Sequence, residues 1–126
     1  VDDEKMIRNV VKEYAQFDGY ETVEAEDGMQ AVEICRKQDF DIIVMDIMMP
    51  MIDGRAVLRE IRRQEEAAGV PWGQGVKVAM LSALHDYTNV LGSFHRDGCD
   101  AYIDKPFSEE SLRAVLDEFG FVMAEN

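Results

Sequence analysis

Five polar side chains stand where predicted β-strands end. They are Asp2, Asp3, Asp46, Ser82 and Lys105. Ligands bind outside the carboxyl ends of the strands in an open α/β sheet, so we expect these side chains to converge on one edge. Three carboxylates held together repel one another unless a cation neutralises them, and Mg²⁺ prefers oxygen ligands. The set predicts a Mg²⁺ site at which one carboxylate can act as a nucleophile on phosphorus.

Lys105 and Ser82 complete this chemistry. A lysine supplies a point charge suited to a phosphoryl oxygen, and a serine offers one hydroxyl donor. Phosphoryl transfer needs mainly positioning and charge neutralisation. Taken alone, Asp2 and Asp3 would cap a helix, Ser82 a strand end, and Lys105 would be a solvated surface residue. Their joint placement favours a shared site, although the residue types also fit a Mg²⁺ site without phosphoryl transfer.

Strand and helix patterns alternate along the chain. Strands are expected at 20–25, 42–46, 76–81 and 101–103. Helices are expected at 6–17, 29–37, 55–67, 85–96 and 108–118. The first helix should turn an apolar stripe to the core, formed by Met6, Ile7, Val10, Val11, Tyr14 and Phe17. The alternation predicts a doubly wound α/β fold with a parallel sheet and helices on both faces.

The first strand of this rhythm is largely absent. A strand should precede Asp2, and only Val1 remains of it. The first strand of a doubly wound sheet is usually central, and losing it would leave neighbouring backbone groups unpaired. We expect one domain over 1–126 with a truncated N-terminal strand. Within the tail at 119–126, residues 119–124 are apolar enough to fill the gap as a strand, in the same chain or from a neighbouring molecule.

Composition limits the function classes. The 126 residues suit one domain, and a net charge of -13 disfavours direct binding to nucleic acid or anionic membranes. Cys35 and Cys99 belong to no Cys/His cluster, so neither a zinc site nor a disulfide framework is expected. No apolar run approaches the roughly 20 residues that cross a bilayer. These features indicate a cytoplasmic protein.

Four segments carry a shared pattern in chain order. They read VDDE at 1–4, MDIMMPMIDG at 45–54, LSA at 81–83 and AYIDKPF at 101–107. Together they resemble the receiver domain of two-component response regulators, the family that includes the single-domain chemotaxis regulator. The resemblance implies a flavodoxin-like, five-stranded parallel sheet of order 2-1-3-4-5.

The resemblance also implies how the acidic residues act. Asp46 would be the phospho-accepting residue. Asp2 and Asp3 would hold Mg²⁺ together with Asp46, Asp3 more directly. Met48 would add its backbone carbonyl oxygen to the metal, so its side-chain type need not matter.

The same resemblance assigns roles on the phosphate side. Ser82 would donate a hydrogen bond to the phosphoryl group, and Lys105 would pair with it. The bond between Lys105 and Pro106 would be cis. Tyr102 would be an aromatic switch that turns inward when Ser82 moves. The plainer alternative for Tyr102 is an ordinary strand aromatic.

The implied function is a phosphorylation-activated switch. A sensor histidine kinase or a phosphotransfer protein would phosphorylate Asp46. The fourth helix, last strand and last helix would then rearrange to control a downstream protein, and could also form a homodimer. The chain would catalyse only its own phosphorylation and dephosphorylation. One alternative is a pseudo-receiver that binds partners without phosphorylation. Another is a phosphatase of the haloacid-dehalogenase type, but such enzymes require a second aspartate two residues after the nucleophile, where this chain has Met48.

Overall fold

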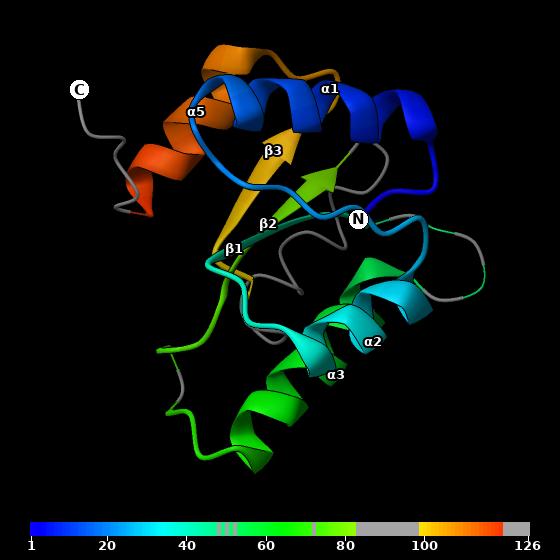
Figure 1. Cartoon of the computed structure of the whole chain (residues 1–126), viewed down its shortest axis with the longest axis vertical. Helices are drawn as coiled ribbons and strands as arrows, with labels where there is room; N and C mark the ends of the chain where they lie inside the picture. Colours follow the sequence, from blue (N-terminus) through cyan, green and yellow to red (C-terminus); the bar gives the residue numbers. More distant parts are fainter. Residues whose placement is uncertain (48, 50, 52, 72, 83–98, 120–126) are drawn as a thin grey trace.

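A parallel sheet lies between two pairs of helices (Figure 1). This computed structural model describes residues 1–47, 49, 51, 53–71, 73–82 and 99–119. Within those residues the sheet has three strands, β1 (Ile42–Asp46), β2 (Lys77–Ser82) and β3 (Ala101–Asp104), in the order β1-β2-β3. Both neighbouring pairs are parallel. The predicted α/β architecture is therefore confirmed, with three of its strands formed.

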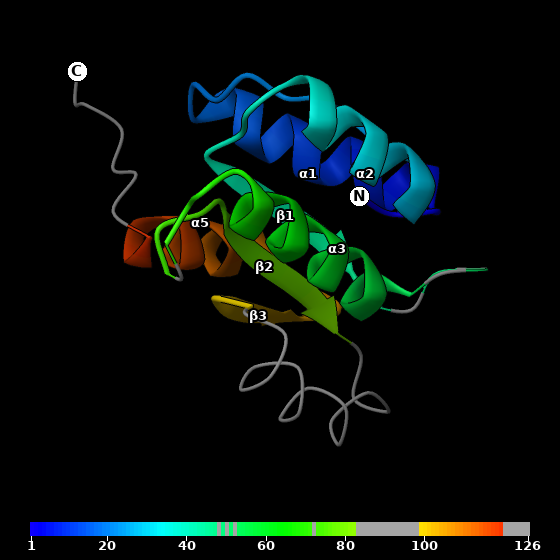
Figure 2. The same ribbon diagram turned by 90° about the horizontal axis from the view of Figure 1, so that it is seen from below.

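Helices cover both faces of the sheet. Helices α1 (Lys5–Phe17) and α5 (Glu109–Glu118) lie on one face, and α2 (Gly28–Lys37) and α3 (Gly54–Ala67) lie on the other (Figures 1 and 2). Each helix of the second pair starts at an aspartate cap: Asp27 accepts from the Gln30 amide, and Asp53 from the Arg55 and Ala56 amides. Ser108 caps α5 through a reciprocal bond pair with Ser111.

The central strand β2 is buried on both faces. Its side chains alternate between two core clusters, as the two-residue period of a strand requires. Val78 and Met80 pack with α3, where the predicted Val57, Leu58 and Ile61 are buried. Ala79 and Leu81 pack with Leu112 and Leu116 of α5. Two separate cores thus hold β2, and through it the ends of its neighbours, in place.

The predicted strand at 20–25 is not formed. A strand needs a partner, and the partner here consists of the first two residues alone. The Val1 nitrogen donates to the Val44 carbonyl at 2.6 Å, and the Asp46 amide donates to the Val1 carbonyl at 2.9 Å. The Asp2 amide donates to the Ala25 carbonyl at 3.2 Å. Through these three bonds, the first two residues bridge β1 and residues 20–25. A cavity of about 550 Å³ is lined by residues of both segments.

A second departure concerns α1. Met6 and Phe17, expected in the core, are 79% and 80% exposed. None of the thirteen residues of α1, all of which the structure describes, is fully buried. Ile7, Val11 and Tyr14 pack only partly against the second core cluster. Residues of α1 line the cavity, where the expected central strand would have packed against them.

A charged network holds the sheet at the edge where β2 and β3 begin, opposite the carboxyl ends of the strands. Arg62 lies 2.8 Å from a Glu65 oxygen and 3.1 Å from an Asp100 oxygen. Glu65 also accepts from the Val76 amide at 2.7 Å, and Asp100 from the Val78 amide at 2.8 Å. The network therefore fixes where the loop after α3 enters β2.

Several predictions lie outside the described residues. They concern the helix at 85–96, the part of the tail at 120–126, and Met48. No described helix is long and apolar enough to cross a membrane.

Candidate functional site

Asp46 is the last residue of β1 and is buried, with 4% of its surface exposed. It pairs in register with Leu81, so Ser82 lies one residue further along the neighbouring strand. The loop beyond β1 closes tightly, because the Gly54 amide donates to the Ile47 carbonyl at 2.7 Å. A Cβ at position 54 would overlap the main-chain carbonyl oxygen of Asp46. Gly54 therefore allows α3 to start directly against the end of β1.

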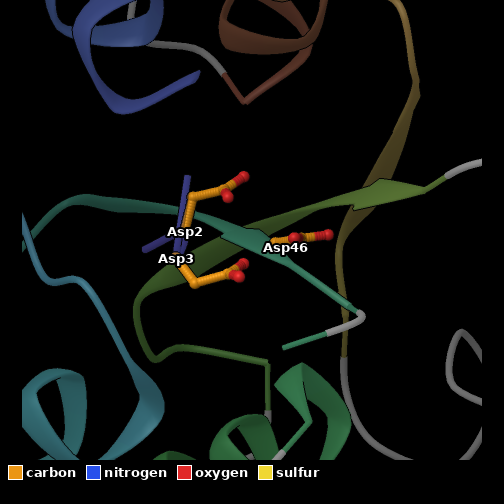
Figure 3. A group of neighbouring side chains, drawn as sticks. All are labelled: Asp2, Asp3 and Asp46. Atoms are coloured by element: carbon orange, nitrogen blue, oxygen red, sulfur yellow. The ribbon is translucent and has the colours of Figure 1, made fainter. Parts of the chain in front are cut away.

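Asp2, Asp3 and Asp46 come together as the sequence predicts. One carboxylate oxygen from each lies within 4.8 Å of the others. Figure 3 shows the three side chains extending in the same direction from two neighbouring segments. Asp2 is 2% exposed, whereas Asp3 is open to solvent. The cluster thus has a buried side and a solvent side.

The Asp2 carboxylate is anchored at one oxygen only. Its Oδ1 accepts from the Glu4 amide at 2.9 Å. Its Oδ2 is buried and has no hydrogen-bond partner among the described residues. A buried carboxylate oxygen without a donor is costly unless a cation lies nearby. Three clustered carboxylates with one unsatisfied oxygen fit the ligand preferences of Mg²⁺.

Lys105 is the cation that faces this cluster. Its Nζ lies 3.1 Å from Asp46 Oδ1, 3.6 Å from Asp2 Oδ2 and 4.0 Å from a Glu4 oxygen. Its amide donates to the Ser82 carbonyl at 2.8 Å, which fixes the residue directly after β3. Burial opposes the charged ammonium, but Asp46 and Asp2 outweigh it, so the pKa of Lys105 lies above its usual value. Lys105 is therefore charged at neutral pH.

The remaining predicted residues lie near this edge or on the strands that reach it. Ser82 is buried at the end of β2, in register with Asp104. The bond between Lys105 and Pro106 is cis, as predicted. Tyr102 lies on β3, pairs in register with Met80 and packs against the first core cluster. Its part in a switch stays a prediction.

Comparison with known proteins bears on this arrangement. The family model of the response regulator receiver domain matches residues 1–117. The chain belongs to this family.

Relatives of this receiver chain include transcriptional regulators. The probable transcriptional regulator ycf27 of Porphyridium aerugineum is 33% identical over 116 residues, which is 92% of the chain and 44% of the relative. The DNA-binding dual master transcriptional regulator RpaA of Synechocystis is 32% identical over 114 residues, 90% of the chain and 44% of the relative. The chain thus spans less than half the length of these relatives.

Solved receiver domains have the same fold. The receiver domain of the Francisella response regulator 1452 has a TM-score of 0.78 at 31% identity, covering 95% of the chain and 93% of that domain. The receiver domain of the sensor histidine kinase PA1611 from Pseudomonas aeruginosa has a TM-score of 0.76 at 31% identity, with the same coverage. That structure holds a magnesium ion in its active-site cleft.

Two residues near the site of this receiver chain were not predicted. Glu4 supplies both the amide that anchors Asp2 and a carboxylate near Lys105. Gly54 permits the close packing against Asp46. The Asp-Gly pair at 53–54 predicts a turn, but only the folded chain shows which backbone it touches. Glu4 follows the acidic pair, and helix capping explains it equally well from sequence.

Proposed function

We propose that this chain is a phosphorylation-activated switch in which Asp46 accepts a phosphoryl group. The observation that supports the proposal is one buried carboxylate, Asp46, facing the ammonium of Lys105 and two further carboxylates. A structural ion pair needs one carboxylate for one cation. Here Asp2, Glu4 and Asp46 all lie within 4.0 Å of one lysine ammonium, which leaves excess negative charge that a metal ion would neutralise before a phosphoryl group enters.

In the proposed reaction the donor is a phosphohistidine on a sensor kinase or a phosphotransfer protein. An oxygen of the Asp46 carboxylate attacks phosphorus, and the P–N bond to the imidazole breaks. The imidazole leaves with the bonding electron pair and takes up a proton. The product is an acyl phosphate on Asp46. Lys105 neutralises charge on the phosphoryl oxygens, and the Ser82 hydroxyl donates to one of them.

Asp2, Asp3 and Asp46 would hold Mg²⁺, with the backbone carbonyl of Met48 as a further ligand. When bound, the ion supplies positive charge that stabilises the phosphoryl oxygens during transfer. The lack of a hydrogen bond at the buried Oδ2 of Asp2 supports this assignment. The chain's own residues orient the acceptor oxygen, which lies beside the Lys105 ammonium. Later hydrolysis of the acyl phosphate would reset the switch, so the chain acts only on itself.

The proposed output is a change in one face of the domain. A phosphoryl group on Asp46 would draw Ser82 and Lys105 toward it, and Tyr102 would follow. The face formed by residues 85–96, β3 and α5 would then bind a downstream protein or a second copy of the chain. The related transcriptional regulators support an output domain as that partner. We place this switch, one receiver domain over 1–126, in the cytoplasm and assign it no direct contact with nucleic acid.

Intact-mass measurement tests the proposal. The parent chain, Asp46→Asn and Asp41→Asn are incubated with acetyl phosphate, with Mg²⁺ or with a chelator. Asp41 is an exposed aspartate just before β1 and serves as the matched control. The parent and Asp41→Asn should gain one phosphoryl group only with Mg²⁺, and Asp46→Asn should gain none. If folded parent protein gains no mass with either acetyl phosphate or a phosphorylated donor protein, the pseudo-receiver alternative is favoured.

A further inference from the structure

Arg8 on α1 makes two contacts that the predicted site does not use. Its Nη1 donates to the main-chain carbonyl oxygen of Asp2 at 2.8 Å. Its Nε donates to Glu24 Oε1 at 3.3 Å. Only 13% of the Arg8 side chain is exposed, which is little for a guanidinium. One side chain thus joins the segment that carries the acidic pair to the segment at 20–25.

These contacts complete the support of Asp2. Its amide is held by the Ala25 carbonyl, its carbonyl by Arg8, and its Oδ1 by the Glu4 amide. Every polar group of Asp2 except Oδ2 therefore has a hydrogen-bond partner, and Oδ2 lies 3.6 Å from the Lys105 ammonium. The backbone of Asp2 cannot rotate without breaking one of these bonds. The orientation of Oδ2 toward Lys105 follows from this arrangement.

Glu24 makes a largely covered arginine compatible with a neighbouring cation site. An unpaired guanidinium there would repel a divalent ion. Glu24 accepts from Arg8, and its other oxygen lies 3.3 Å from the Lys12 ammonium. Burial acts to raise the pKa of Glu24, but hydrogen bonds from Lys12 and Arg8 outweigh it and hold the pKa below its usual value. The charge of Arg8 is thus offset while its hydrogen bonds remain.

We propose that Arg8 is a positioning residue that holds Asp2 in its metal-binding orientation. The inference rests on the proposed metal site and adds a residue outside the ligand set. Partners that orient metal ligands from outside the ligand set typically change metal affinity about tenfold or more when removed. Lysine cannot replace the arginine fully, because its single ammonium lacks the planar fork that reaches two acceptors.

Lys12 provides a matched control on the same helix. It contacts the same carboxylate, Glu24, one turn further on, but has no contact with Asp2 among the interactions of the described residues. Arg8→Met and Lys12→Met each remove one positive charge. By charge alone, both changes should strengthen the binding of a cation. A weakening caused by Arg8→Met has the opposite sign and therefore identifies positioning.

The test titrates the full chain with Mn²⁺ and measures free Mn²⁺ by electron paramagnetic resonance. Arg8→Met should raise the Mn²⁺ Kd about tenfold with one site per molecule retained. Lys12→Met should bind as tightly as the parent or more tightly, and Arg8→Lys should lie between. A merely structural role would reduce the number of sites in proportion to unfolded protein and leave Kd unchanged. That result, or equal Kd values for Arg8→Met and Lys12→Met, overturns the inference.

If Arg8→Met cannot be folded, Arg8→Lys gives the answer, because it keeps the positive charge but lacks the planar fork that reaches two acceptors, and it should still raise Kd. An unchanged Kd for folded Arg8→Lys then overturns the inference. Failure of the proposed function is separable. The parent chain could bind Mn²⁺ and accept no phosphoryl group, while Arg8→Met raises Kd. This result would refute the acceptor role of Asp46 and support the positioning role of Arg8. A parent chain that binds no Mn²⁺ overturns both.

Discussion

The ammonium nitrogen of Lys105 lies 3.1 Å from Oδ1 of Asp46, and the same nitrogen lies 3.6 Å from Oδ2 of Asp2. One cation after β3 therefore neutralises buried carboxylates from two other segments. Both carboxylates are almost fully buried, so the lysine stabilises the fold as well as the site. A ligand that draws Lys105 toward itself would loosen both contacts together.

Replacing Lys105 by methionine should destabilise the chain and make its stability depend more strongly on Mg²⁺ than that of the parent. Two buried carboxylates lose their cation, and the free energy of unfolding should fall by about 3 kcal/mol in chelator. Added Mg²⁺ should recover much of this loss by binding the folded state. Urea unfolding with and without Mg²⁺ measures both effects. Equal losses under the two conditions would contradict a cation site at Asp2 and Asp46.

The contribution of Lys105 should disappear only in alkaline solution. Its pKa is raised above the usual 10.5 in the folded state, so the folded chain holds this proton more tightly than the unfolded chain does. The stabilisation is complete below the unfolded value and is lost as pH rises through the folded value. The difference in unfolding free energy between parent and Lys105→Met, followed by urea titration, should stay constant until pH passes 10.5. A decline near neutral pH would refute the assignment.

Gly54→Ala should distort the acceptor end of β1. A methyl group there overlaps the Asp46 carbonyl, and the backbone must move at a cost of about 3 kcal/mol. Phosphoryl uptake from acetyl phosphate should slow as well. Gly69→Ala is the control, because its methyl group meets open space and the left-handed φ of +85° alone should cost about 1 kcal/mol. Equal rates of uptake in the two variants would separate Gly54 from the site.

Arg62→Met should weaken the fold and spare the chemistry. The change leaves the partly buried Glu65 and Asp100 without their shared cation, so the free energy of unfolding should fall by about 2 kcal/mol. The network lies at the opposite edge of the sheet, so phosphoryl uptake by folded protein should be unchanged. Arg63→Met removes an exposed pair with Glu60 and should leave urea unfolding unaltered. A large loss in Arg63→Met would show that surface charge, not the network, governs stability.

The two cysteines should differ in reactivity. Burial raises the pKa of Cys99 to about 11, and its thiol donates to the Ala101 carbonyl at 3.0 Å. Cys35 is half-buried, and burial also raises its pKa. Because the thiolate is the reacting form, iodoacetamide near neutral pH should modify Cys35 first and Cys99 only after unfolding. Mass spectrometry of parent and Cys35→Ser distinguishes the sites, and rapid modification of folded Cys35→Ser would be contrary evidence.

The edge of the sheet that carries the site could be predicted from sequence, because parallel strands present their carboxyl ends together. The apolar runs that precede Asp46, Ser82 and Lys105 were enough to predict that these residues lie at strand ends. Val57, Leu58 and Ile61 followed from helical spacing. These inferences use local patterns, which a residue's neighbours in sequence determine.

The departures arise where a residue depends on a distant partner. Residues 20–25 have strand-forming side chains, but a strand requires a ladder, and in the described part of the chain only Asp2 supplies a ladder bond. Met6 and Phe17 have helical spacing but are exposed, and the inward side of the same helix at Ile7 and Val11 lines a cavity. Arg8 reads as an ordinary polar helix residue, because its two acceptors are known only after the chain has folded. The roles of the site residues in phosphoryl transfer stay predictions until tested.

The lack of a fully buried residue in α1 has a consequence for how the site opens. Asp2 and Asp3 directly precede this helix, whereas Asp46 ends a strand whose Met45 is completely buried. Regions with few buried contacts open locally at a lower free energy than the core does. The amide hydrogens of α1 should therefore exchange with solvent through small fluctuations, and those of β1 only when the whole chain unfolds. An ion bound by Asp2, Asp3 and Asp46 would link the segment that opens most easily to the strand that opens last. It would slow amide exchange in α1 first.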